Sequence, residues 1–178
     1  MKKKIVLFII VIMASQQVQA QNWQPVSAVV SFNIKMLGIN VLGNFKGLAA
    51  SVKFDPAAPE NGSIAATVDA ATIDTDNKLR NSHLREKEEF FDTAKYPKIT
   101  MKSTKIEKTN TGYLGYFDLT IKNTTRSVKL PFTFTNTDEK GIFKGSVVIN
   151  RRDWKVGGGT LGMSNDVTIS LTINTLAK

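Results

Sequence analysis

The feature of this sequence that most constrains its fold is a regular alternation of apolar and polar residues, repeated in many short segments. In one of them, Val167, Ile169, Leu171 and Ile173 alternate with polar residues. Successive side chains of a β-strand point to opposite faces of a sheet, so this alternation indicates a strand with one buried face. Similar segments lie at residues 29–36, 44–54, 64–70, 98–108, 113–122, 127–135 and 142–150. The sequence therefore predicts an all-β, antiparallel barrel or sandwich of about eight strands. It leaves open whether the interior of such a barrel is hollow or filled by side chains.

One long segment, residues 75–97, does not follow this alternation. Its distinctive side chains are Arg80, His83 (the only histidine in the chain), the aromatic pair Phe90 and Phe91, and Asp92. Some of its apolar residues recur at helical spacing, and Thr75 or Asp76 can cap a helix. We therefore expect a short helical insertion near residues 76–92 that packs over the barrel.

The residues that carry most enzyme chemistry are scarce. The chain has one histidine and no cysteine, so a metal site and thiol chemistry are not expected. No phosphate-binding glycine motif precedes a helix. We therefore predict no catalytic residue, no metal and no cofactor. We interpret His83 as part of a structural hydrogen-bond network with Arg80 and Asp92; the alternative is contact with the polar head group of a ligand.

The N-terminus is typical of a secretory signal peptide. Lys2, Lys3 and Lys4 precede a short apolar run over residues 5–13, and the segment ends at Ala20. We expect cleavage after Ala20 and a periplasmic or secreted protein.

The charge of the chain is basic but dispersed. The net charge is +9, and because three lysines and no acidic residues lie in the signal segment, residues 21–178 carry +6. The lysines stand singly between apolar residues, and export makes nucleic-acid binding an improbable use for them. A weak contact with an anionic membrane surface fits this charge better.

Several motifs in the chain resemble the YceI-like family of exported polyisoprenoid-binding proteins. They are Arg80-Asn-Ser-His83-Leu84, Glu89-Phe90-Phe91-Asp92, Tyr96-Pro97, Leu119-Thr120-Ile121, Thr125-Arg126-Ser127-Val128, Asn150-Arg151-Arg152-Asp153-Trp154 and Asp166-Val167-Thr168-Ile169. The resemblance covers nearly all of residues 21–178. The chain departs from the family at Asn81, where an aspartate is usual, at Phe117 and Asn123, where glycines are common, and at Lys35 or Met36, where many members have a histidine.

The resemblance implies one lipocalin-like barrel domain over residues 21–178, with a long apolar pore. The pore would hold an isoprenoid chain, such as that of an isoprenoid quinone or polyprenyl lipid, for carriage or sequestration and without catalysis. On this basis we select apolar side chains as ligand contacts: Phe32, Ile34, Phe117, Leu119, Phe132, Phe134, Ile169 and Leu171 in the pore, and Phe90 and Phe91 at its mouth or side.

Two other functions remain open from the sequence. The chain could be an enzyme that acts on an apolar substrate and uses His83 with Asp92 or Asp76. It could also be a structural or stress-related envelope protein whose barrel is filled. Some relatives are dimers, so a homodimer is left open as well.

Overall fold

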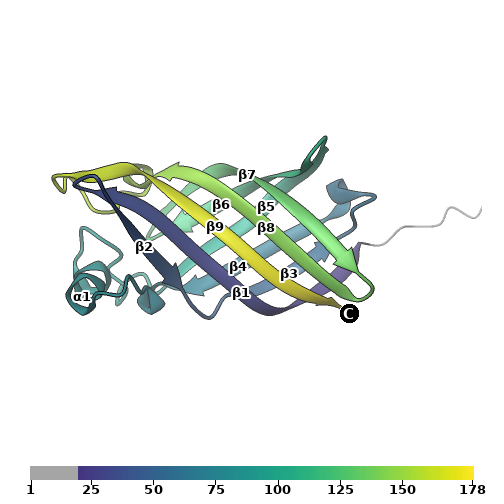
Figure 1. Cartoon of the computed structure of the whole chain (residues 1–178), viewed down its shortest axis with the longest axis horizontal. Coiled ribbons are helices and arrows are strands. Elements are labelled where there is room, and N and C mark those ends of the chain that lie inside the picture. The colour runs from purple at the N-terminus through teal and green to yellow at the C-terminus, as the bar shows by residue number, and fades with distance from the viewer. Residues whose placement is uncertain (1–19) are drawn as a thin grey trace, which may run out of the picture.

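Most of the chain lies in one antiparallel sheet that wraps around a common interior (Figure 1). The computed structural model describes residues 20–178; the predicted signal peptide, apart from Ala20, lies outside them. The strands are β1 (Gln21–Met36), β2 (Ile39–Phe45), β3 (Ala49–Phe54), β4 (Ser63–Asp69), β5 (Lys98–Thr109), β6 (Gly112–Ile121), β7 (Thr124–Thr137), β8 (Lys140–Asn150) and β9 (Met163–Ala177). The helix α1 spans Lys78–Glu86, and short 3-10 turns lie at Pro59–Asn61, Ala70–Thr72 and Arg151–Trp154.

The sheet closes on itself. Each strand from β3 to β8 pairs with the next one in the chain, β9 pairs with β1, and β1 pairs with β3. The eight strands β1 and β3–β9 therefore form a closed antiparallel barrel, and β2 is an extra strand along the C-terminal half of β1. This confirms the fold class predicted from the alternation, and it also selects the barrel over the sandwich.

The segment over residues 44–54 differs from its prediction as a single strand. It breaks between β2 and β3, where Gly47 has a left-handed φ of +69°. The backbone N–H of Lys46 donates to the Thr72 hydroxyl at 3.0 Å, and Asn44 pairs with Asp74. The outer edge of β2 is therefore bound to residues 72–74, and the turn at Gly47 separates β2 from β3.

The predicted helical insertion is present as α1 and the turns that follow it. The side chain of Asn77 accepts a hydrogen bond from the backbone N–H of Arg80 at 2.9 Å, so Asn77 caps the helix. Thr75 and Asp76, which we expected as caps, lie before it: Thr75 is buried, and Asp76 has a left-handed φ of +56°. Figure 1 shows α1 beside one end of the barrel, with the C-terminus at the opposite end.

The end of the barrel opposite α1 is filled by a cluster of aromatic rings, which we call the aromatic plug. Its members are Trp23, Phe54, Tyr113, Phe132, Phe134 and Phe143. Phe54 is fully buried at the centre, with its ring centroid between 4.9 and 5.8 Å from those of Tyr113, Phe132, Phe134 and Phe143. The indole N–H of Trp23 donates to the carbonyl of Phe54 at 3.0 Å, so the one polar atom of the indole ring is satisfied.

No helix within residues 20–178 is long and apolar enough to cross a membrane.

Candidate ligand-binding site

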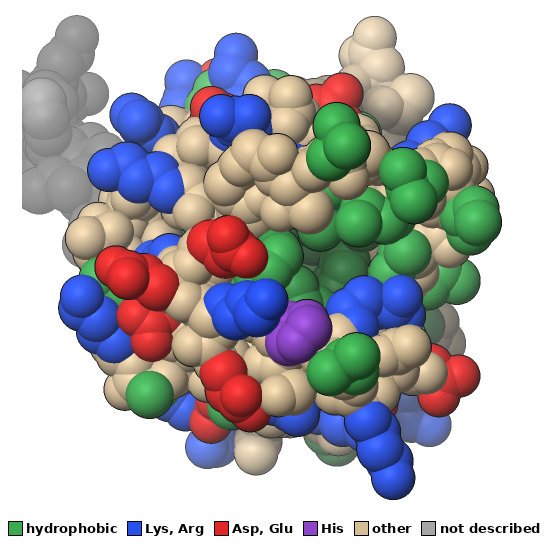
Figure 2. All heavy atoms as spheres, turned by 90° about the vertical axis from the view of Figure 1, so that its left-hand side faces the viewer, with side chains coloured by type: hydrophobic (Ala, Val, Ile, Leu, Met, Phe, Trp, Pro, Cys, Tyr) green, Lys and Arg blue, Asp and Glu red, His purple; other side chains and the backbone are tan. Residues whose placement is uncertain are grey.

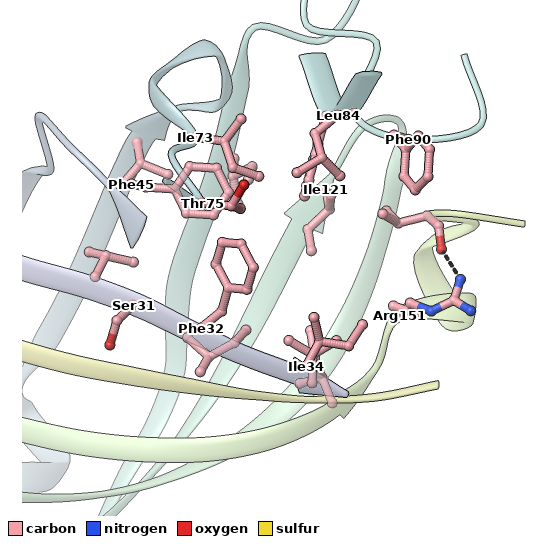
Figure 3. A pocket seen from close by; sticks show the side chains of 18 of the residues that line it. Ser31, Phe32, Ile34, Phe45, Ile73, Thr75, Leu84, Phe90, Ile121 and Arg151 are labelled. Atoms are coloured by element: carbon pink, nitrogen blue, oxygen red, sulfur yellow. Dashed lines mark hydrogen bonds between the residues drawn. The ribbon is translucent and has the colours of Figure 1, made fainter. Parts of the chain in front are cut away.

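The half of the barrel next to α1 encloses a cavity of about 520 Å³. Inward-facing side chains of the barrel strands form its wall, and residues of β2, α1 and the turns after α1 form its rim. Figure 2 views the face of the molecule at this end and shows a hollow whose interior is hydrophobic. In the close-up, Phe32 and Ile34 of β1 face Phe45, Ile73, Leu84 and Phe90 across the space (Figure 3). The volume lies within the range of about 300–1,000 Å³ that is typical of small-molecule sites.

The structure separates the ten apolar residues predicted to contact a ligand into two groups. Seven of them line the cavity: Phe32, Ile34, Phe90, Phe91, Leu119, Ile169 and Leu171. The other three, Phe117, Phe132 and Phe134, lie outside it in the core of the opposite half. Alternation identifies the inward face of a strand, but it does not indicate the height along the barrel axis at which a side chain lies. Contact of the seven with a ligand stays a prediction.

Phe117 marks the boundary between the two halves. Leu119, the next inward residue on β6, lines the cavity, and so does Val128, the residue paired with Phe117 on β7. Phe117 itself is only 1% exposed. Its ring lies over Gly115, where a Cβ atom would clash with the ring, so the side chain points towards the plug. Phe117 therefore lies directly below the part of β6 that lines the cavity, without lining the cavity itself.

The length of the cavity follows from the strands that line it. On β9, the lining residues extend from Met163 to Leu171. At ~3.3 Å per residue and with a strand tilt of about 35–45°, this is roughly 20 Å along the barrel axis. With a carbon–carbon bond of ~1.5 Å, one isoprene unit spans roughly 5 Å. The cavity therefore has the length of about four isoprene units.

A buried network of hydrogen bonds fixes α1 over the rim of the cavity. The Asn81 side-chain oxygen accepts from the Thr75 backbone N–H at 2.9 Å and from its hydroxyl at 2.6 Å. Arg80 donates to the Thr75 hydroxyl at 2.7 Å and to its carbonyl at 2.6 Å. The Asn81 amide donates to the Asp74 carboxylate at 3.0 Å. The backbone N–H of Asp76 and this amide hold the pKa of Asp74 below its ordinary value.

The hydrogen bonds at this rim differ from the network that we inferred from the sequence. Arg80 bonds to Thr75, and no hydrogen bond or ion pair within residues 20–178 joins it to His83 or Asp92. Arg80 and His83 both line the mouth of the cavity, where Figure 2 shows the histidine beside the opening. Asp92 is a turn residue with a φ of +46°, and its backbone carbonyl accepts from the N–H of Tyr96 at 2.8 Å.

Two residues that shape the site were not selected from the sequence, Asn81 and Arg151. Arg151 lines the cavity, is 5% exposed, and has its guanidinium surrounded by backbone carbonyls. It donates to the carbonyls of Ser164 at 2.8 Å and Val156 at 2.7 Å, with longer bonds to Gly158, Met163 and the Asn165 side chain. Burial lowers the pKa of Arg151 from its ordinary value. Both residues stand in motifs that carried the family resemblance, but only the folded chain shows their partners.

The contacts of Arg151 hold residues 156–164 as part of the rim. The backbone N–H of Gly157 also donates to the carbonyl of Glu89 at 2.5 Å, which joins this loop to the segment after α1. Neither the rim nor any other part of residues 20–178 contains a group of three or more histidine, cysteine, aspartate or glutamate side chains arranged to bind a metal ion. The polar groups at the rim can orient a ligand, while the interior offers mostly apolar contact.

Together, the fold and the site define an antiparallel β-barrel with a blind apolar pocket: one end is open beside α1 and the other is closed by the aromatic plug. The family model of the YceI-like domain matches residues 22–175, and the chain belongs to this family.

Relatives of known sequence and of known structure agree with this assignment. A UPF0312 protein of Photorhabdus laumondii is 36% identical over 104 residues, which are 58% of this chain and 54% of that protein. The UPF0312 protein of Yersinia enterocolitica is 33% identical over 109 residues, or 61% of this chain and 56% of that one. The chain thus spans about half the length of the curated relatives it matches.

Two solved structures share the barrel. BcnA of Burkholderia cenocepacia has a TM-score of 0.77 and 31% identity, over 83% of this chain and 95% of that one. A polyisoprenoid-binding domain from Saccharophagus degradans has a TM-score of 0.63, over 90% of this chain and 99% of that one. At 15% identity, this second likeness shows the shared fold.

Proposed function

We propose that this protein binds the isoprenoid chain of a lipid, such as an isoprenoid quinone or a polyprenyl lipid, and carries or sequesters it without catalysis. The observation that carries the proposal is the cavity itself, which is blind, elongated and lined almost throughout by apolar side chains. Membership of the YceI-like family supports it, and so does the fold shared with a domain described as polyisoprenoid-binding.

Burial of the chain supplies the affinity. Each CH₂ group that leaves water contributes about 0.8 kcal/mol, and the ordering of the chain and the loss of its free motion offset part of this gain. The polar side chains are confined largely to the rim, among them Arg80, His83, Lys87 and Glu89. The tail therefore enters first, and the head group remains at the mouth. Selectivity would come from chain length and from a few polar contacts at the rim.

Export is part of the proposal. The basic, apolar and small-residue regions of residues 1–20 support a signal peptide that is cleaved after Ala20. A periplasmic or secreted carrier would meet isoprenoid lipids at a membrane surface.

The experiment that tests the proposal identifies what the cavity holds. The protein is exported by its own N-terminal segment, purified without detergent and extracted with organic solvent, and the extract is analysed by mass spectrometry. We expect a stoichiometric isoprenoid. A fatty-acyl lipid in its place, or an empty extract after quinones and polyprenols have been offered, would overturn the proposal.

A pair of matched variants shows whether the extract comes from the cavity. Leu171→Trp places a large ring inside the cavity, because Leu171 lines it. Val148→Trp adds the same ring on the outer surface, where Val148 is 59% exposed. We expect the isoprenoid to be lost from the first variant and kept by the second. Equal amounts of lipid in both would show that it binds elsewhere.

A further inference from the structure

The rim of the cavity carries the most exposed large hydrophobic side chains of the described part of the chain. Leu161 is 90% exposed, Leu37 74%, Ile39 71% and Leu79 68%. We call these four residues the mouth collar. Leu42, three residues after Ile39 on β2, is also 68% exposed, whereas the other exposed large hydrophobic residues, Val26, Val29, Val148 and Leu176, reach only 40–59%.

The collar residues lie together at the opening. The backbone N–H of Leu37 donates to the carbonyl of Gly162 at 2.7 Å, and the Leu37 side chain covers the position that a Cβ of Gly162 would take. Leu37 is thereby held next to Leu161. Ile39 pairs with Met36, which lines the cavity, and Leu79 lines the cavity as well. The collar is therefore continuous with the apolar wall of the pocket.

The turn that presents Leu37 is poorly explained by folding alone. Leu37 and Gly38 form the two-residue loop between β1 and β2 and have φ values of +50° and +82°. Two positive φ values are typical of a type I′ turn, which favours Asn-Gly. The other non-glycine residues with positive φ in residues 20–178 are aspartates and lysines. Leucine at this position is unfavourable both for the backbone and for solvation, and such local conflicts are expected at functional sites.

Charge supports one kind of partner for this surface. Lys35 and Lys78, both exposed, stand next to the collar in sequence. Figure 2 shows hydrophobic side chains on one side of the hollow with lysine and arginine side chains bordering them, while acidic side chains gather on the other side. A hydrophobic patch rimmed by basic groups complements a bilayer that contains anionic lipids.

We propose that the mouth collar docks the barrel, open end first, onto an anionic lipid bilayer. The inference rests on the proposed function, because docking would let an isoprenoid chain pass between the bilayer and the cavity without crossing water. Apolar side chains of the collar enter the interface between head groups and acyl chains, and the acidic side of the mouth stays in water.

The test compares two double variants of residues 21–178, the part of the chain that contains the whole closed sheet. Leu37→Asn with Leu161→Asn removes two collar side chains that do not line the cavity. The change at residue 37 introduces the residue that the turn prefers, so the melting temperature should not fall. Val26→Thr with Val148→Thr removes two exposed hydrophobic side chains from the barrel wall and serves as the control. Binding is measured by flotation with vesicles of phosphatidylcholine and phosphatidylglycerol.

We expect the collar variant to partition into the vesicles about tenfold more weakly than the wild type, or weaker still, and the control to match the wild type. Both should take up a detergent-dispersed polyprenol as the wild type does. Equal partitioning of both double variants would overturn the docking proposal. A wild type that takes up polyprenol but does not float with the vesicles would also overturn it. So would a collar variant that differs from the wild type only in sedimentation mass, because the collar would then be an interface with a second copy of the chain. A wild type that takes up no polyprenol would count against the proposed function, whichever way the vesicles behave.

Discussion

Replacement of Phe117 by alanine should lengthen the cavity by about one isoprene unit. Phe117 is the first inward side chain below the cavity on β6, between Leu119 of the cavity wall and Tyr113 of the aromatic plug. The substitution removes the six carbons of the ring and keeps the Cβ, and six carbons are more than the five of an isoprene unit. In the wild type, affinity should therefore rise with chain length up to about four units and then level off. In the variant, the rise should continue for one more unit.

The size of the effect can be worked out from burial. Five carbons at ~0.8 kcal/mol each give a gain of up to about 4 kcal/mol for the added unit. Ordering of that unit reduces the gain, so we expect the variant to bind the five-unit chain at least about tenfold more tightly than the wild type does, which corresponds to ~1.4 kcal/mol. The loss of a buried phenylalanine should lower the free energy of unfolding by about 3–5 kcal/mol. Protein with an intact fold must therefore be verified by circular dichroism.

The assay is a titration with a series of isoprenoid alcohols of increasing length, followed by tryptophan fluorescence or by displacement of a fluorescent ligand. Phe134→Ala is the matched control, because Phe134 packs against Trp23, Phe54 and Phe143 and does not border the cavity. It removes the same atoms but should leave the levelling point unchanged. The reasoning fails if wild-type affinity keeps rising for chains far longer than the cavity, or if the two variants shift the levelling point equally.

Four further predictions concern the mouth of the cavity. Asn81→Ala should lower the free energy of unfolding by about 1–3 kcal/mol, measured by urea titration, because it leaves the buried N–H of Thr75 without its acceptor. A variant as stable as the wild type would refute this role. Arg151→Lys should cost at least about 2 kcal/mol, since a single ammonium cannot satisfy the carbonyls that the guanidinium fork reaches, and a melting temperature equal to that of the wild type would contradict it. The pKa of Asp74 is lowered in the folded protein, so its stabilising contribution is present above the pKa of this carboxyl in the unfolded chain and is lost as the pH falls through the folded value. Thermal stability should therefore decline below about pH 4. Asp74→Asn should weaken that decline. His83→Ala should retain isoprenoid binding; a wild-type turnover of an apolar substrate that disappears in this variant would instead favour an enzyme.

The sequence determined the fold class and the kinds of residue at the site more fully than the geometry of the site. Alternation is a local property with a period of two residues, and it identified the inward face of every barrel strand. The motif around Arg80 and His83 likewise identified the segment that forms part of the mouth. The sequence indicated neither the break at Gly47 nor the contacts of Lys46 and Asn44, whose partners come from residues 72–74, far along the chain.

Only the tertiary structure decided which part of the barrel is hollow. Phe32 and Phe134 look alike in the sequence, since both are aromatic and stand on the apolar face of a strand. One lines the cavity and the other packs into the plug, because the register of eight strands places each inward side chain at a particular height along the barrel axis. At one end six rings from five strands meet and fill the space; at the other, the wall is formed mostly by aliphatic side chains and the space stays open. Height along the axis depends on all the strand pairings together, and the alternation within a single strand carries no record of it.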